Sequence, residues 1–153
     1  MTMDPFHAGL LQRAAACMST ILRDAPAELE LLMEDFSSAN EAADAFFLFA
    51  DACVTATGAM ATREADEIID GLAAPLAEVD LLRLGADMVR AQTHDDREER
   101  AEAAAAFADS GEALRAGMTI AIAAVQALAD ATGRSPTDWA STFAVNAARL
   151  GDE

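Results

Sequence analysis

The chain has 153 residues, with 27 acidic and 10 basic side chains that give a net charge of −17. A charge of this sign repels nucleic acids and anionic membrane surfaces, whose binders depend on basic residues, so we expect neither as a partner. Every basic residue is arginine, and the absence of lysine excludes phosphate-binding P-loops and Schiff-base chemistry. The arginine bias is typical of GC-rich coding sequence and predicts a bacterial or bacteriophage source. The length predicts one domain over residues 1–153.

The beginning of the chain carries two helical patterns. Asp4 and Pro5, an N-cap followed by a proline in the first turn, open an amphipathic helix over residues 5–23. Pro26 opens a second, shorter helix. Leucine, methionine and phenylalanine form one face of this second helix, and carboxylates form the other.

The most apolar stretch, residues 40–57, predicts a helix that is hydrophobic around most of its circumference. Such a helix belongs at the centre of a fold. Its interior charges are Asp44 and Asp51 alone. We expect Asn40 to cap its N-terminus and Gly58 to close it in a left-handed conformation.

Between this helix and the next strongly apolar one, the helical spacing of apolar residues is interrupted several times. Thr62 can cap one helix, and Pro75 begins another. The polar stretch at 91–96 predicts a break or kink in the helix. After it, a charge-rich helix over 96–108 has Phe107 as its only large apolar side chain. We expect this helix to be lightly packed.

The second strongly apolar helix is predicted over residues 111–132, opened by a capping box at 109–112 and closed by Gly133. Its many alanines allow a neighbour to come close, so we expect it to pack against the helix at 40–57. Ser135 opens the last helix. No stretch shows the alternation of a strand. The sequence therefore predicts an all-α, single-domain bundle of about six helices with the two apolar helices at its centre.

The two cysteines, Cys17 and Cys53, lie among apolar helical residues and form no CxxC motif. No positive charge flanks them to stabilise a thiolate, so we expect buried, unreactive thiols. The N-terminus lacks the pattern of a secretory signal. The longest uncharged run, 116–129, falls short of the roughly 20 residues that span a bilayer. We therefore expect a cytoplasmic protein.

Motifs for metal binding and catalysis are scarce. The two histidines, His7 and His94, are not paired at the spacings of zinc or di-iron helices. His94 beside Asp95 could form part of a site, but a solvated loop histidine is the simpler interpretation. The string DDREE at 95–99 resembles the DDxxE motif with which helical synthases hold magnesium on a diphosphate. Those enzymes use a larger bundle and a second motif, both of which are missing from this sequence.

Two pairs of carboxylates, each spaced three residues apart, suggest an alternative enzymatic function that uses magnesium. Glu64 and Glu67 precede Asp95 and Glu98, and the arrangement resembles the paired ExxE and ExxD motifs of all-α nucleotide pyrophosphohydrolases. In that family four carboxylates from two helices gather Mg²⁺ on a triphosphate, so the resemblance implies a magnesium site at these four residues. The second pair is reversed relative to the family, and no lysine is present to bind phosphates. An exposed acidic helix face is the competing interpretation.

Elimination therefore favours an interaction function over an enzymatic one. We expect a non-catalytic accessory or regulatory module, without a cofactor, that binds an unidentified protein through a helix face or an acidic patch. A basic partner fits the charge, although solubility alone also explains it. Phe6 and Trp139 lie near helix ends where a second copy could cover them, so a homodimer is a further expectation. The enzymatic alternative is the magnesium-dependent nucleotide hydrolase.

Overall fold

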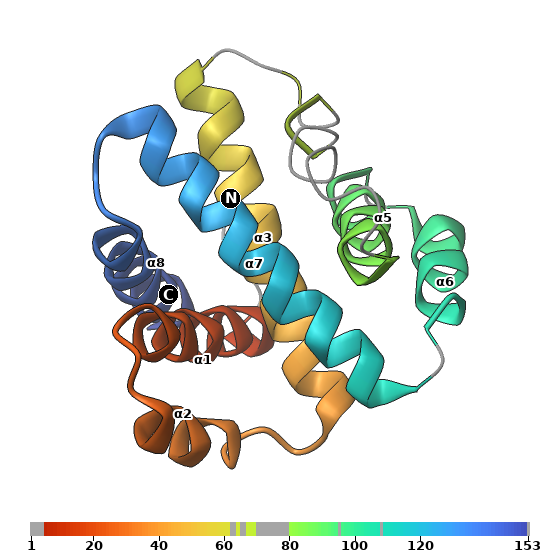
Figure 1. Cartoon of the computed structure of the whole chain (residues 1–153), viewed down its shortest axis with the longest axis horizontal. Coiled ribbons are helices and arrows are strands. Elements are labelled where there is room, and N and C mark those ends of the chain that lie inside the picture. Colours follow the sequence, from red (N-terminus) through yellow and green to blue (C-terminus); the bar gives the residue numbers. More distant parts are fainter. Residues whose placement is uncertain are drawn as a thin grey trace.

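The computed structural model describes residues 5–61, 64, 67–69, 80–94, 96–107 and 109–152 (Figure 1). The helices with assigned bounds are α1 (Pro5–Leu22), α2 (Pro26–Met33), α3 (Ala39–Ala61), α5 (Asp80–His94), α6 (Arg97–Ala105), α7 (Ser110–Thr132) and α8 (Pro136–Asp152). Residues 67–69 are also helical, and no strand occurs in these ranges. The all-α prediction is confirmed, with more helices than the six or so predicted. The helices expected at Thr62 and Pro75 begin outside the described residues.

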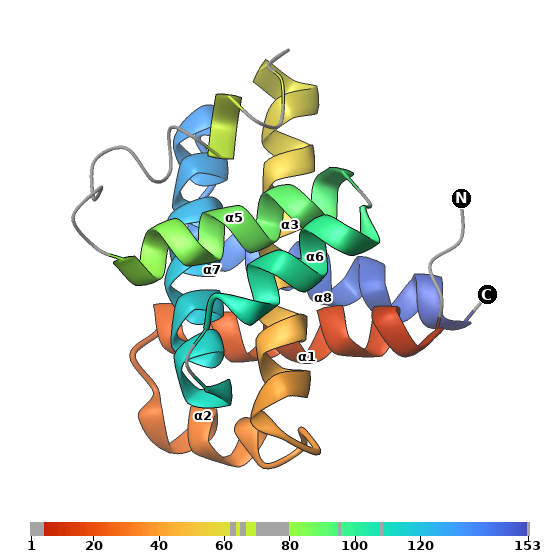
Figure 2. The same ribbon diagram turned by 90° about the vertical axis from the view of Figure 1, so that its right-hand side faces the viewer.

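Helices α3 and α7 cross the middle of the molecule side by side (Figures 1 and 2). Small residues permit this close approach. A Cβ atom added at Gly117 of α7 would lie 3.2 Å from the Phe46 Cβ and 3.3 Å from the Ala43 carbonyl oxygen of α3. The prediction that the two most apolar helices pack together is thus confirmed.

The core lies between these two helices and their neighbours. Phe46 and Phe49 of α3, Met18 of α1, and Ile120 and Leu128 of α7 are among its largest fully buried side chains. Phe47 is 3% exposed, and its ring centroid lies 6.1 Å from that of Phe107. Fully burying each phenylalanine contributes about 1.5–3 kcal/mol through removal of apolar surface from water.

The ends of α3 differ from the prediction. The helix begins at Ala39, and the Ser38 hydroxyl accepts a hydrogen bond from the Glu41 amide at 3.2 Å, so Asn40 is not the cap. Gly58 lies within the helix, which continues to Ala61. A glycine in a helix interior costs about 1 kcal/mol relative to alanine, an amount that the contacts of a central helix outweigh.

The ends of α7 agree with the prediction. The Asp109 carboxylate accepts a hydrogen bond from the Glu112 amide at 2.8 Å, as an N-cap should. Gly133 has φ of 76° and donates its amide hydrogen to the Ala129 carbonyl. Glycine reaches this left-handed conformation without the cost that a Cβ atom imposes, and it therefore ends the helix cleanly.

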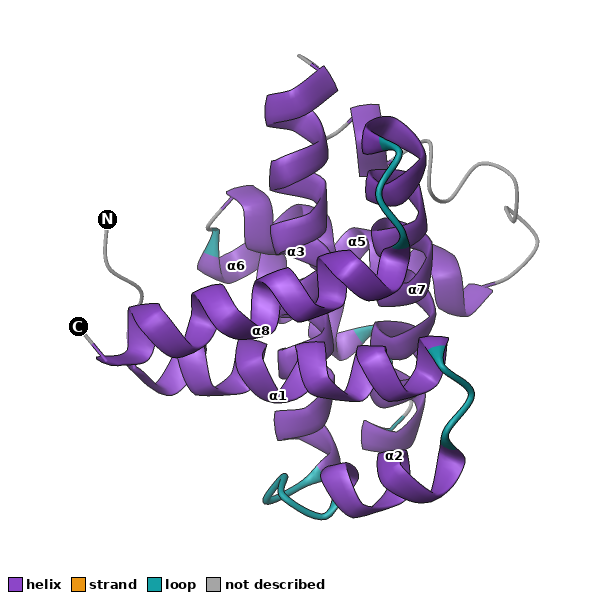
Figure 3. Ribbon diagram, turned by 90° about the vertical axis from the view of Figure 1, so that its left-hand side faces the viewer, coloured by secondary structure: helices purple, strands orange, loops and turns teal. Residues whose placement is uncertain are grey.

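Helices α1 and α8 lie antiparallel against one side of the central pair (Figure 3). Trp139 of α8 is only 6% exposed. Its indole nitrogen donates a hydrogen bond to the Thr132 hydroxyl at 2.9 Å, and the Arg134 guanidinium lies 4.3 Å from the ring centroid. The expectation that Trp139 offers an uncovered surface to a second copy is wrong, because the end of α7 and the following turn cover it. The side chain of Phe6 lies outside those described.

Helices α5 and α6 lie on the opposite side of the central pair (Figure 1). α5 ends at His94 and α6 begins at Arg97, which confirms the predicted break. Between them, one oxygen of the Asp96 carboxylate accepts hydrogen bonds from the Glu98 and Glu99 amides at 3.0 and 3.2 Å. α6 has no buried residue, as expected of a lightly packed helix.

Two segments of the central pair are also long and apolar enough to cross a membrane. They span Ala39–Met60 and Gly111–Thr132, and half of each segment is buried inside the fold. The core helices of soluble proteins pass the same test of length and composition, so these segments decide nothing about location. The cytoplasmic location stays a prediction.

Candidate functional site

The four carboxylates of the predicted magnesium site lie in different settings. Glu64 and Glu67 are exposed and follow α3 in the chain, and Glu98 is exposed in the first turn of α6. Asp95 lies outside the described residues. Among the residues that are described, no three histidine, cysteine or acidic side chains are grouped so that they could hold a metal. The described residues therefore gather no ligand set of their own, and the magnesium site stays a prediction.

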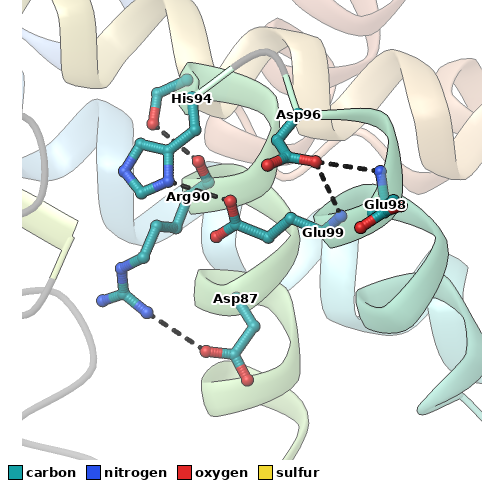
Figure 4. Close-up of polar contacts among 7 residues, drawn as sticks. Asp87, Arg90, His94, Asp96, Glu98 and Glu99 are labelled. Carbon is teal, nitrogen blue, oxygen red and sulfur yellow. Dashed lines mark hydrogen bonds and ion pairs between the residues drawn. The ribbon is translucent and has the colours of Figure 1, made fainter.

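The junction between α5 and α6 holds a set of exposed polar pairs (Figure 4). The His94 Nδ1 atom lies 3.0 Å from a Glu99 carboxylate oxygen, and Arg90 contacts Asp87 at 3.2 Å. His94 is thus the last residue of α5 rather than a loop residue. Exposed pairs of this kind contribute about 0–1 kcal/mol each. Asp96, part of the DDxxE-like string, caps α6, so the geometry seen here serves the helix junction.

The two thiols are fully buried. Burial, with a smaller contribution from the nearby Asp35 carboxylate, raises the pKa of Cys17 to about 11. Burial also raises the pKa of Cys53. Both thiols therefore stay protonated at neutral pH, which agrees with the predicted lack of reactivity.

A hollow of about 390 Å³, lined by both polar and apolar groups, lies between α3 and α5. Asp51 and Thr55 line it from α3, and Gln92 and Thr93 line it from α5. Burial raises the pKa of the Asp51 carboxyl to about 6, and no nearby charge contributes to the shift. The sequence marked Asp51 only as a charge in an apolar helix. Whether this charge is buried depends on where α5 packs against α3, and the sequence does not show that.

A second hollow, of about 310 Å³, lies beside the first and shares Gln92 with it. Its floor is apolar, formed by Phe47, Leu48 and other side chains of α1, α3 and α5. Asp44 and Arg100 lie among its polar lining residues, and both have partners. The two interior carboxylates of α3 thus line neighbouring hollows on the same side of the molecule.

Helix α2 presents a different kind of surface. Four of its eight residues are large and apolar, and none is fully buried. Leu29, Leu32 and Met33 are partly buried against the core, so Leu31 is the large apolar side chain of α2 that faces solvent. Leu31 is 66% exposed, the highest value among the large hydrophobic residues described. Four carboxylates near Leu31 in the chain are exposed as well, those of Glu28, Glu30, Glu34 and Asp35. We call this helix, with its flanking acids to Asp35, the α2 face.

Comparison with known proteins identifies no relative of this chain. The chain was compared with protein-family models, with curated proteins and with solved structures, and none of the three gives a match. The functional argument therefore rests on the residues themselves.

Proposed function

We propose that the protein is a non-catalytic interaction module that binds another protein through the α2 face. The observation that carries this proposal is the 66% exposure of Leu31 on a helix without a buried residue. Burying a leucine side chain fully contributes about 1.5–3 kcal/mol, so the folded monomer leaves much of that free energy unused. Binding of a partner that covers Leu31 would gain this free energy.

The charge around Leu31 defines the chemistry of the partner. The carboxylates of Glu30, Glu34 and Asp35 are exposed, and Glu28 forms only an exposed ion pair with Arg23 at 3.2 Å. A complementary surface therefore combines basic side chains at its rim with an apolar centre, as amphipathic helices often do. A second copy of the chain fits this face poorly, because each copy carries a net charge of −17.

Affinity purification from the native host, followed by mass spectrometry, tests the proposal when three baits are compared. The wild-type chain should retain a stoichiometric protein, Leu31→Gln should lose it, and Val145→Gln should keep it. Val145 is the matched control because it is 52% exposed on α8. Retention of the same protein by Leu31→Gln would refute a role for the α2 face.

Salt dependence gives a second measurement with the purified pair. Surface charges separated by more than about 8 Å are largely screened at 0.15 M salt, so affinity should fall steeply between 0.05 and about 0.3 M if the acids steer the partner. Affinity that does not change with salt would remove the basic rim from the proposal. The magnesium alternative is tested separately by triphosphate hydrolysis with Mg²⁺, where activity that disappears in Glu67→Gln would replace the interaction function.

A further inference from the structure

The hollow between α3 and α5 places polar side chains beside apolar ones on a helix that otherwise belongs to the core. Asp51, Thr55 and Gly58 are spaced four and three residues apart, so they share one stripe of α3 along the hollow. Gly58 lies inside the helix, where glycine costs about 1 kcal/mol relative to alanine. Gly58 lines the hollow together with Asp51 and Thr55. The stripe therefore places a carboxylate and a hydroxyl along the hollow.

Asp51 has no partner of its own within the described part of the chain. Neither a hydrogen bond nor an ion pair to its carboxylate occurs there, and the residue is only partly exposed to solvent. A carboxylate in such a position is costly to ionise unless a donor or a positive charge compensates it. The described residues thus place an acid on the central helix without a donor or positive charge beside it.

The other polar groups in the hollow are suited to receive hydrogen bonds. The Thr93 hydroxyl already donates to the Arg90 carbonyl at 2.9 Å, so its oxygen is left as an acceptor. The Gln92 side-chain amide lines the hollow from α5 and includes a carbonyl acceptor, and Val54 and Ala59 supply apolar contact. A primary ammonium group has three donors and no acceptor, which complements this set.

From this geometry we infer that the hollow binds a small organic cation, whose primary ammonium group donates hydrogen bonds to the Asp51 carboxylate and to the acceptors of α5. A volume of about 390 Å³ falls within the roughly 300–1,000 Å³ of small-molecule sites. The short alkyl part of the ligand packs on Val54 and Ala59. This site is separate from the α2 face, so its test does not depend on the proposed function.

The test uses n-butylammonium as the probe, followed by amide NMR shifts in 0.15 M NaCl at pH 7.5. The amides of Thr55, Gly58 and Thr93 should shift together and saturate in the wild-type protein. Asp51→Asn should weaken the apparent affinity at least tenfold while leaving the circular dichroism spectrum unchanged. Asp44→Asn, which removes the other interior charge of α3, should bind as the wild type does.

Three outcomes would overturn the inference. Equal weakening in Asp44→Asn and Asp51→Asn would show general attraction of cations by the acidic protein. The same saturating shifts with neutral n-butanol would show apolar adsorption without a role for the ammonium group. Shifts that stay linear to high probe concentration would show that no site exists. Loss of a protein partner by Leu31→Gln, or its retention, leaves each of these readouts unchanged.

Discussion

Replacing Asp51 by asparagine should stabilise the protein at pH 8 and change its stability little at pH 4. Burial raises the pKa of this carboxyl from 3.8 to about 6 in the folded state. Well below the unfolded pKa of 3.8 the group is protonated in both the folded and the unfolded chain, and at pH 4 its effect on the balance between them is still small. As the pH rises from about 4 to about 6, the unfolded chain releases the proton first, and the free energy of unfolding falls. Above that window the loss is complete and constant.

The size of the effect follows from the pKa change. A difference of about two pH units corresponds to about 3 kcal/mol as an upper bound. The side chain keeps some contact with solvent, which screens the charge, so we expect about 1–1.5 kcal/mol. Asparagine has nearly the same shape and removes the charge. Asp51→Asn should therefore raise the free energy of unfolding by this amount at pH 8, or the melting temperature by about 2–6 °C.

Urea unfolding monitored by circular dichroism at pH 4 and pH 8 measures the difference. Glu30→Gln serves as a control, because it removes one negative charge from an exposed helix position and should change stability by less than about 0.5 kcal/mol at both pH values. A gain for Asp51→Asn that is equal at the two pH values, or a loss at pH 8, would refute the reasoning. The first result would mean that the carboxylate is not desolvated, and the second that it has a stabilising partner.

Three further predictions concern the core. Phe47→Ala should cost about 3–5 kcal/mol in urea unfolding because Phe47 is 3% exposed, and a loss under 1 kcal/mol would contradict its place in the core. Gly85→Ala should destabilise the protein by about 1–2 kcal/mol, because the added Cβ atom would lie 3.0 Å from the Ala116 carbonyl oxygen. Gly9→Ala meets no atom within 4 Å and should instead stabilise α1 by about 0.5–1 kcal/mol. Equal effects of the two substitutions on the free energy of unfolding would refute this distinction. Cys17 and Cys53 should react with a thiol reagent at pH 8 far more slowly in native buffer than in denaturant, because both are buried and their pKa values are raised, and comparable rates in the two buffers would show that the thiols are accessible.

The helices were predictable where local signals and burial agree. Residues 40–57 and 111–132 are apolar around most of their surface, which leaves only the centre of a fold for them, and Asp109 and Gly133 mark the ends of α7 by chemistry that needs no neighbour. The ends of α3 were less predictable. Gly58 has the residue type of a helix end, but packing carries the helix past it to Ala61.

The candidate sites depended on contacts that the sequence does not contain. Asp51 was visible only as an isolated charge, and its desolvation follows from the packing of α5 on that side of α3. Trp139 lies near a helix end, and only the path of the turn at Arg134 determines that it is covered. Spacing alone cannot set the distance between two acidic helices, so the carboxylate pairs could not be judged as a metal site.

The weak attachment of α6 has a consequence for how the molecule moves. A helix without buried residues gains little from tertiary packing, so the free energy needed to open it is well below that of global unfolding. Its amide hydrogens should exchange with solvent at low protection, while those of α3 and α7 should exchange only when the whole protein unfolds. Each opening uncovers the apolar floor formed by Phe47 and Leu48. A protease acting on the native protein should therefore cut first within α6, leaving the central pair intact after the first cleavage.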